Sequence, residues 1–374
     1  MTLTPRALNR ATLARQLLLR REPIGVVEAL GRVFALQAQE APSPYLALWN
    51  RVDGFDASAL DLAFVAQDVV KAQLLRITLH AVTAEDYPAV HEAMQVTLRS
   101  ARLYDRRFRN EGVSIEEVEA LLPDLLAFAA EPRRNQDVEA WLEERFGGPK
   151  PFVWWAIRQY GPFVHAVSGG PWSFAARPAY VGAFEQGRPG DEAASTRLLV
   201  RRYLEAFGPA TAADIAQFST ILRPPIHAAI RDLGDELVTV DGPAGVLVDV
   251  SGGPLPDEDT PAPARLLPMW DSVLLAYKDR SRIIPPAYRR LVIRSNGDVL
   301  PTLLVDGYVA GVWRPTEDGI EASAFEALPD DAWEGIEREA RALLDFLADR
   351  EPLIYRRYWR WWEQLPIAES RLLR

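Results

Sequence analysis

The chain has 374 residues, a formal net charge of −10 and no cysteine, which excludes disulfides, thiolate catalysis, Cys-type zinc sites and iron–sulfur clusters. Its four histidines show no metal-site spacing such as HExxH, so we expect no metal, with a carboxylate site for magnesium as the alternative. No apolar run reaches membrane-spanning length and no signal-peptide core is present at the N-terminus, so we expect a cytoplasmic protein without a membrane partner.

Two helices are predicted at the N-terminus. Thr4-Pro5 is an N-cap followed by a first-turn proline, and Pro23 opens a second helix that runs to Gln37 and Gln39. The stretch Ala41–Pro44 then leaves the helix, because each proline restricts the residue before it. The two amides would lie at a helix end, where they can point into a cleft and orient a water near a developing charge. The alternative is that they are surface glutamines that cap the helix.

The middle of the chain predicts a strand, a long helix and then a winged-helix pattern. Arg76–Val82 is rich in β-branched residues and is typical of a strand, and Thr83 caps the helix that follows. Three helices and a two-stranded hairpin are then predicted, over Ile115–Phe128, Asp137–Phe146, Val153–Tyr160, Phe163–Val167 and Trp172–Ala175. That order of elements is typical of a winged helix, although its sequence is a poor copy of the segment described next.

The clearest pattern lies between Thr196 and Asp241. Three helices are predicted over Leu198–Phe207, Ala212–Phe218 and Pro224–Leu233, followed by a strand over Glu236–Val240 and a turn. This is the winged-helix order. Two such units in tandem favour nucleic-acid binding, but winged helices also serve as protein-interaction modules, so the pattern leaves both open.

The C-terminal third changes to β-structure after an acidic, proline-rich linker at 252–263. Strands are predicted over Arg290–Ser295, Asp298–Val305 and Tyr308–Arg314, joined by turns at Asn296-Gly297 and Asp306-Gly307. A helix over Asp331–Leu347 precedes a Trp/Arg-rich tail, Tyr355–Trp362, which could stack on bases but which we expect to pack on the core.

We therefore predict an α+β fold with tandem winged helices around a DNA channel and a C-terminal antiparallel β-rich module. The predicted domains are a helical, winged-helix-like region with the glutamines at 1–90, winged helices at 91–190 and 191–251, the linker at 252–263, and the β-hairpin module with its terminal helix at 264–374. Arginine supplies nearly all the positive charge and clusters at 99–109, 197–202 and 280–294, while acidic residues gather elsewhere. Such segregation indicates a charged channel, with solvated helix faces as the alternative.

Three local stretches together resemble a known family, the AlkZ-like winged-helix DNA glycosylases of the azinomycin self-resistance type. Leu36–Gln39 matches the family's catalytic Gln-x-Gln motif, Arg76–His80 is similar to its R-x-T-x-H segment, and Leu267–Leu274 with Asp279-Arg280 and Val299–Gly307 resembles its P-x-x-D…D-R…LPVLLVDG pattern. Gln39 places the chain in the Gln-x-Gln branch rather than the Gln-x-Asp branch. Met269-Trp270 departs from the small or aromatic pair of relatives.

The resemblance implies a monofunctional DNA glycosylase that acts in DNA repair or self-resistance on bulky N7-alkylguanine, with interstrand crosslinks as a further candidate substrate. Gln39 would position the water and Gln37 would stabilise the sugar cation or assist. Because an N7-alkylated purine is already cationic, it leaves without a strong acid, and no lysine near the motif in sequence offers a Schiff base. The expected partner is duplex DNA, the expected state is a monomer, and no cofactor is needed.

Five more residues are candidates for contact with DNA or the lesion: Arg76, Thr78, His80, Arg280 and Asn296. His80 could equally be a hydrogen-bonded core histidine. Asp271 and Arg280 could form a buried ion pair that holds the C-terminal module, or Arg280 could contact phosphate. The turn at Asn296 could probe a groove, although a scaffold turn is the simpler interpretation. The rival functions are a winged-helix transcription regulator and a protein-interaction scaffold.

Overall fold

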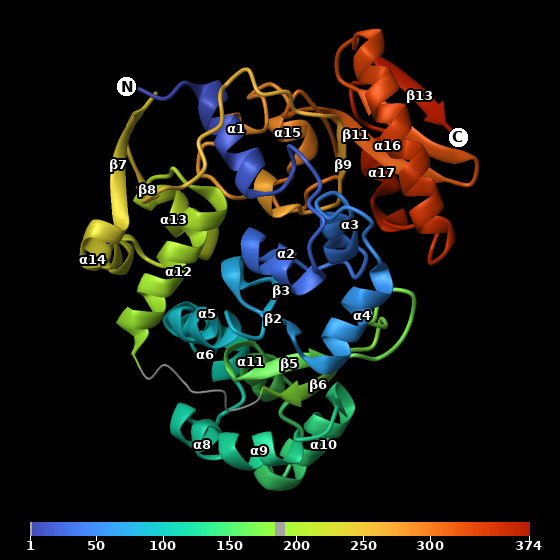
Figure 1. Cartoon of the computed structure of the whole chain (residues 1–374). Helices are drawn as coiled ribbons and strands as arrows, with labels where there is room; N and C mark the ends of the chain where they lie inside the picture. The colour runs from blue at the N-terminus through green and yellow to red at the C-terminus, as the bar shows by residue number, and fades with distance from the viewer. Residues whose placement is uncertain (1, 184–190) are drawn as a thin grey trace.

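The computed structural model describes residues 2–183 and 191–374 and has a mixed α/β architecture with antiparallel sheets (Figure 1). The first part contains α1 (Pro5–Arg15), α2 (Val26–Val33), β1 (Leu36–Gln37), α3 (Ser43–Trp49), α4 (Ala57–Ala66), β2 (Val69–Gln73), the 3-10 turn η1 (Leu75–Ile77) and β3 (Leu79–Thr83). The predicted start of α1 is confirmed, since the Thr4 hydroxyl accepts a hydrogen bond from the Ala7 N–H at 3.0 Å. The three strands form a sheet in the order β1-β3-β2.

The glutamines do not lie at a helix end, which corrects the prediction for this segment. Helix α2 ends at Val33, and Phe34 takes a left-handed conformation with φ 75°. Gln37 is then paired with His80 as part of strand β1. Strand β3 supplies hydrogen-bond partners for this backbone, so its N–H and C=O groups are satisfied without a longer α2. The predicted strand at 76–82 also starts late, at Leu79, since Arg76 and Ile77 are left-handed.

The next part contains α5 (Tyr87–Ala93), α6 (Gln95–Leu103), α7 (Arg106–Arg109), α8 (Ile115–Ala120), α9 (Leu122–Phe128), β4 (Arg133–Arg134), α10 (Asn135–Phe146), α11 (Pro151–Tyr160), β5 (Phe163–Ala166) and β6 (Ala179–Gly182). The predicted helices are confirmed, but two are divided. The helix after Thr83 breaks at Met94, and the helix at 115–128 breaks at Leu121, because Pro123 cannot continue the hydrogen-bond ladder.

The predicted strand Trp172–Ala175 is wrong. The partner of β5 is β6, which also pairs with β4 in a sheet of order β4-β6-β5. Trp172 packs edge-on against Tyr45, with ring centroids 5.2 Å apart, and is buried in a loop. Tertiary packing of an aromatic side chain thus overrides its local β-propensity. The end of the predicted segment 91–190, at 184–190, lies outside the described residues.

The order of elements predicted for 196–241 is confirmed. The structure has α12 (Glu192–Phe207), α13 (Ala212–Ser219), α14 (Arg223–Leu233), the turn η2 (Gly234–Glu236), β7 (Leu237–Gly242) and β8 (Gly245–Val250). Thr211 and Asp214 form a capping box at the start of α13. A single bridge joins Ala210 to Val248, so the β7–β8 hairpin is held against the turn before α13.

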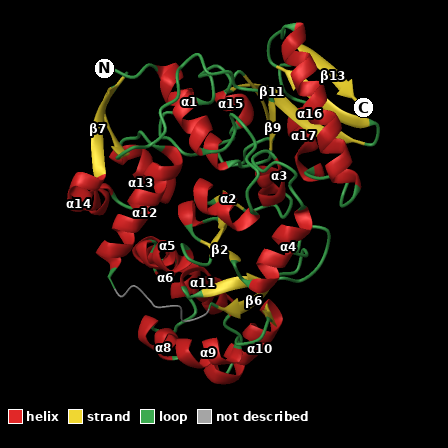
Figure 2. Ribbon diagram, in the orientation of Figure 1, coloured by secondary structure: helices red, strands yellow, loops and turns green. Residues whose placement is uncertain are grey.

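The C-terminal part is a five-stranded antiparallel sheet covered by a long helix (Figures 1 and 2). Its elements are β9 (Arg265–Leu267), η3 (Ser272–Leu274), η4 (Arg280–Arg282), α15 (Arg289–Val292), β10 (Thr302–Val305), β11 (Tyr308–Thr316), β12 (Gly319–Ala324), α16 (Asp330–Ala348), η5 (Arg356–Tyr358), α17 (Trp359–Trp362) and β13 (Glu369–Leu373), and the sheet order is β13-β12-β11-β10-β9. The predicted α16 and β11 are confirmed.

Two strand predictions in this part are corrected. Arg289–Val292 is helical, and only Ile293 and Val299 form a bridge around the Asn296-Gly297 turn. Strand β10 begins at Thr302 rather than Asp298, because its register is set by pairing with β9, a partner distant in sequence. None of the helices in the described ranges is both long and apolar enough to cross a membrane.

The core consists of two large clusters that meet at the glutamine segment, which we define as residues 36–40. One cluster joins the N-terminal helices to the C-terminal sheet and includes Leu36 and Ala38. The other joins α5–α14 to the central strands and includes Phe34 and Ala35. The expected packing of the aromatic tail is confirmed, since Trp361 and Trp362 are buried in the first cluster. The division into five domains stays a prediction.

Candidate functional site

Gln37 is a buried amide held by an arginine. Its side chain belongs to a residue only 5% exposed, and its Oε1 accepts a hydrogen bond from Arg76 Nη2 at 2.7 Å. A guanidinium can only donate, so the atom that faces Arg76 must be the amide oxygen. The amide NH₂ group of Gln37 therefore remains available for another acceptor.

His80 orients the same arginine from the neighbouring strand. His80 Nδ1 lies 3.0 Å from the Thr78 carbonyl oxygen and Nε2 lies 3.1 Å from Arg76 Nη2. The carbonyl requires Nδ1 to carry the proton, so Nε2 accepts from Arg76. Burial, and then the charge of Arg76, lowers the pKa of His80 well below 6.5. His80 is thus a neutral, fully buried imidazole that supports Arg76.

Arg76 reaches the glutamine from an unusual turn. Its backbone is left-handed, with φ 53°, and the Thr78 hydroxyl donates back to the Leu75 carbonyl at 3.1 Å to close the turn. The guanidinium carbon lies 4.9 Å from the ring centroid of Phe218 on α13. Thr78 therefore shapes the loop that delivers Arg76, and α13 supplies the surface on which the guanidinium rests.

Arg280 adds a second positive charge beside Arg76. Arg280 Nη1 donates to the Leu274 carbonyl at 2.8 Å. Burial, and then the charge of Arg280, lowers the pKa of Arg76 to about 9, and burial with the charge of Arg289 lowers the pKa of Arg280 to about 10. Because these pKa values lie above 7, Arg76 and Arg280 remain charged at neutral pH. Within the described parts of the chain, Arg76, Arg280 and Arg289 form no ion pair with a carboxylate, so no acidic side chain neutralises the positive charge beside Gln37.

Gln39 lies on the exposed side of the same segment. It is solvent-exposed and has no hydrogen-bond partner among the described residues, while the Ala38 N–H before it donates to the Leu79 carbonyl at 2.8 Å. The backbone is thus fixed by β3 up to Ala38, and the Gln39 side chain is free to meet a ligand. Gln37 and Gln39 differ in environment, the first clamped and the second open.

Glu40 ties the glutamine segment to the C-terminal tail. Its Oε1 lies 2.5 Å from Arg357 Nη2 and accepts from the Tyr358 hydroxyl at 3.4 Å. Burial raises the pKa of Glu40, against the opposing effect of Arg357. Sequence reasoning missed this contact, because the partners are more than 300 residues apart and only the folded chain brings them together.

The predicted ion pair between Asp271 and Arg280 is wrong. Asp271 is paired with Arg51, whose Nη1 and Nη2 atoms each lie 2.8 Å from a carboxylate oxygen, and both side chains are fully buried. Asp271 also caps the short turn η3 by accepting from the Val273 N–H. The structural role expected for Asp271 is therefore present with a different partner. Arg51 lies just after α3, and no motif in the sequence marks it as the partner of Asp271.

Asn296 lies in an exposed turn that Trp270 holds by a hydrogen bond. Its Nδ2 donates to Asp298 Oδ2 at 2.9 Å, and Gly297 adopts φ 89°, a conformation that suits glycine. Trp270 Nε1 donates to the Gly297 carbonyl at 2.8 Å and its ring meets Tyr358 edge-on. Trp270, the departure noted in the sequence, thus connects the Asp271 segment to this turn.

Lys71 is a buried residue of strand β2, and no pattern in the sequence predicted its burial. Its Nζ lies 4.5 Å from the ring centroid of Phe174, and burial lowers its pKa to about 8. Lys71 is paired with Ala81, whereas Gln37 is paired with His80. Adjacent strand positions alternate between faces, so the lysine lies on the face of the sheet opposite Gln37.

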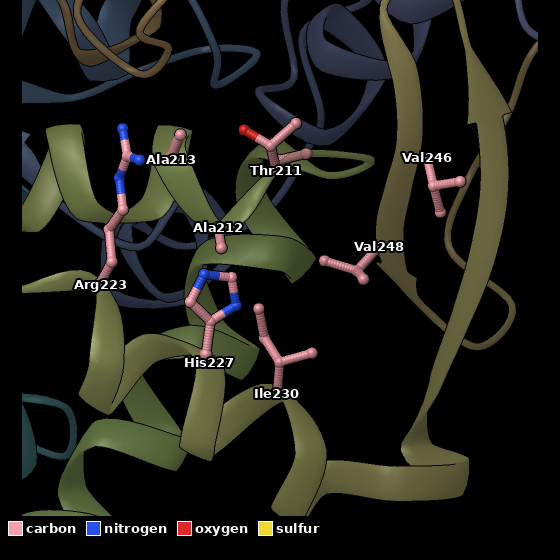
Figure 3. Close-up of a pocket in the computed structure, with 9 residues that line it drawn as sticks. Thr211, Ala212, Ala213, Arg223, His227, Ile230, Val246 and Val248 are labelled. Atoms are coloured by element: carbon pink, nitrogen blue, oxygen red, sulfur yellow. The ribbon is translucent and has the colours of Figure 1, made fainter.

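A separate hollow of about 380 Å³ lies between α14, the start of α13 and β8 (Figure 3). His227 and Ile230 of α14 face Ala212, and Val248 of β8 closes the hollow. Its lining is largely apolar and contains neither glutamine, so this hollow is distinct from the candidate site.

An amide motif beside arginines that lack acidic partners is typical of an enzyme acting on a polyanion such as DNA. The family model described as "DNA glycosylase AlkZ-like" matches residues 30–346. The chain belongs to this AlkZ-like family and is a DNA glycosylase. It is similar to an interstrand DNA cross-link repair glycosylase of Streptomyces sahachiroi, with 25% identity over 87% of this chain and 92% of the relative. The solved structure of the S. sahachiroi DNA glycosylase AlkZ resembles it with a TM-score of 0.76 and 20% identity, covering 92% of this chain and 96% of that chain.

Proposed function

We propose that this glycosylase hydrolyses the N-glycosidic bond of bulky N7-alkylguanine in duplex DNA, with interstrand crosslinks as a second substrate class. Its role would be repair of DNA, or self-resistance to a genotoxic natural product, and it would act as a cytoplasmic monomer at the nucleoid. The cross-link repair activity named for the S. sahachiroi relative supports this proposal. The transcription-regulator and scaffold alternatives have no comparable support.

The chemistry needs a placed water rather than a strong acid. Alkylation at N7 makes the purine a cationic leaving group, and the sugar passes through a state that resembles an oxocarbenium ion. The exposed Gln39 would hold the water at C1′ through its amide. His80 is neutral and turned into the fold, and Glu40 is bound to Arg357, so neither competes for the role of general acid.

Gln37 would assist Gln39 rather than stabilise the sugar cation alone. Its carbonyl oxygen is already engaged by Arg76, so the group left for the reaction is the NH₂. An N–H donor suits the oxygen of a water or of the neighbouring amide. This clamped amide beside the open Gln39 is the observation that carries the proposal, because only a fixed partner keeps a small nucleophile in line.

The surrounding helices would form the DNA-binding walls. We interpret α12, α13 and α14 with β7–β8 as one winged helix, and α8–α11 with β5–β6 as a second. Exposed Arg223, His227 and Arg231 recur every four residues on α14, so they share one face of that helix. Arg76, Arg280 and the turn at Asn296 would contact phosphates or the lesion, and an open channel would admit an adduct too bulky for a tight base-flipping pocket.

The test is base release by Gln39→Ala on duplex DNA that carries a bulky N7-alkylguanine, read as strand breaks after alkaline treatment. We expect single-turnover release to fall by about 100-fold or more, while duplex binding stays within a few fold. Gln136→Ala, which removes an exposed amide on α10, is the matched control. Equal loss of binding would mean that Gln39 is structural. Operator-specific binding without any base release by the unaltered protein would favour a regulator instead.

A further inference from the structure

A second hollow, of about 510 Å³, lies next to the glutamine segment. Three of its lining residues are arginines, Arg294, Arg357 and Arg360, and we call it the arginine hollow. Asp298 lines it as well and Glu40 contacts Arg357, so three guanidiniums meet two carboxylates in a chain whose net charge is −10. A local excess of positive charge of this kind attracts anions.

Two of the three arginines lack an acidic partner. Arg294 is held by stacking, with its guanidinium carbon 4.3 Å from the ring centroid of Trp361. Arg360 is exposed, and no carboxylate in the described chain forms an ion pair with either residue. Arg357 is bound to Glu40, and Asp298 is bound to Asn296. With Glu40 and Asp298 counted, the three arginines leave one net positive charge, and Arg294 and Arg360 are the two guanidiniums without an ion-pair partner.

The hollow is built on rigid supports. Tyr358 and Trp361 are 6% and 5% exposed, so their rings form walls rather than open stacking faces. The opposite side is the turn at Asn296, which Trp270 anchors through the Gly297 carbonyl. Because the aromatic faces are covered, the hollow suits a compact oxyanion rather than a base.

The arginine hollow lies beside the glutamine segment, which favours a phosphate of the DNA as its oxyanion. Glu40 follows Gln39 directly in the chain and lies 2.5 Å from Arg357, which lines the hollow. We propose that the arginine hollow binds a phosphodiester of the DNA strand next to the lesion, held by Arg294 and Arg360. This inference rests on the proposed function, and it adds a phosphate site that fixes the duplex relative to Gln39.

The test compares the salt dependence of duplex binding, with undamaged DNA as the probe. We expect Arg294→Gln with Arg360→Gln to weaken binding roughly tenfold or more. The slope of log Kobs against log salt should decrease by about one for each arginine removed. Arg360→Gln alone changes only an exposed side chain and should give half the decrease in slope. Arg338→Gln, which removes an exposed charge from α16, is the control and should leave the slope unchanged.

The outcomes separate this inference from the proposed function. An unchanged slope in the double variant, or an equal decrease in the Arg338→Gln control, would overturn the phosphate site. Release of N7-alkylguanine by the unaltered protein is measured in parallel. If release is absent while the slopes differ as expected, the proposed reaction fails and the phosphate site stands. If the unaltered protein does not bind duplex DNA, both are overturned.

Discussion

Arg76 and Gln37 are joined across 39 residues of chain by a hydrogen bond of 2.7 Å, and this contact sets the orientation of the buried amide. The same Nη2 atom also lies 3.1 Å from His80 Nε2, so one guanidinium fixes two side chains on neighbouring strands. The preorganisation of the candidate site thus depends on the position of one guanidinium nitrogen, Nη2, while the guanidinium itself lies over the ring of Phe218.

Replacing Arg76 with lysine should therefore disable the site while keeping its charge. A lysine ammonium is a compact point charge, so it lacks both the planar group that lies over Phe218 and the second nitrogen that contacts the Phe218 carbonyl, and its position beside Gln37 is less fixed. We expect single-turnover base release by Arg76→Lys to fall roughly 100-fold, the usual cost of a misplaced catalytic group, with DNA binding nearly unchanged. Arg32→Lys on the exposed side of α2 is the control. Equal rates in the two variants would show that Gln37 does not need Arg76.

Removing the carboxylate of Glu40 should affect the reaction more than the stability. Glu40→Gln loses the ion pair with Arg357, whose side chain is 64% exposed and becomes solvated. The free energy of unfolding should change little, since such pairs contribute about 1 kcal/mol or less. We expect kcat to fall several fold with KM nearly constant, because the glutamine segment loses its tie to the tail. The control is Glu363→Gln, which removes an exposed carboxylate of the tail and should leave both constants unchanged. A rise in KM alone for Glu40→Gln would contradict this role.

The pair formed by Arg51 and Asp271 should be essential for stability. Asp271→Ala leaves a fully buried guanidinium without its partner, which typically costs about 3–5 kcal/mol of unfolding free energy. Urea denaturation measures this loss. The double variant Arg51→Leu with Asp271→Leu should recover part of it, because no charge is then left unpaired. A single variant within about 0.5 kcal/mol of the unaltered protein would mean that the site admits water.

Acid should destabilise the protein through two imidazoles, the buried His80 and the half-buried His165. Burial, and then nearby positive charge, holds the pKa of His80 well below 6.5 and lowers that of His165 to about 3. Below about pH 6.5 these two imidazoles bind protons in the unfolded chain but stay neutral in the folded chain. The free energy of unfolding therefore decreases as the pH falls below about 6.5. Each group contributes about 1.4 kcal/mol per pH unit in that window. His165→Phe should flatten the decline between pH 6 and 4 in chemical denaturation, whereas His227→Gln at an exposed position should not.

Lys71 should prove unnecessary for base release. Burial lowers its pKa to about 8, so at pH 7 the folded chain bears the cost of a buried charge, which is relieved as the pH rises through 8. Lys71→Met should raise the unfolding free energy at pH 7 by roughly 3 kcal/mol and remove its rise between pH 8 and 10. Base release should persist, since the lysine is on the face opposite Gln37. Trapping of a borohydride-reducible complex with the unaltered protein, lost in Lys71→Met, would contradict a purely hydrolytic route.

Local signals in the sequence were sufficient for several of the helices. The cap at Thr4, the capping box at Thr211 and the apolar spacing of α16 are properties of neighbouring residues, so the pattern and the structure agree there. The strands were less predictable. The partner of β5, and strands β9 and β13, depend on pairing between distant segments, which no local pattern encodes.

By itself, the sequence determined several of the helices, the absence of thiol chemistry and the motif that contains Gln37 and Gln39. Only the tertiary structure decided that Gln37 is clamped and Gln39 is open, that Asp271 is paired with Arg51, and that Glu40 lies beside Arg357. The physical reason is that a helix is stabilised by contacts three or four residues apart, whereas a buried charge or amide takes whichever partner the folded chain brings within hydrogen-bond distance.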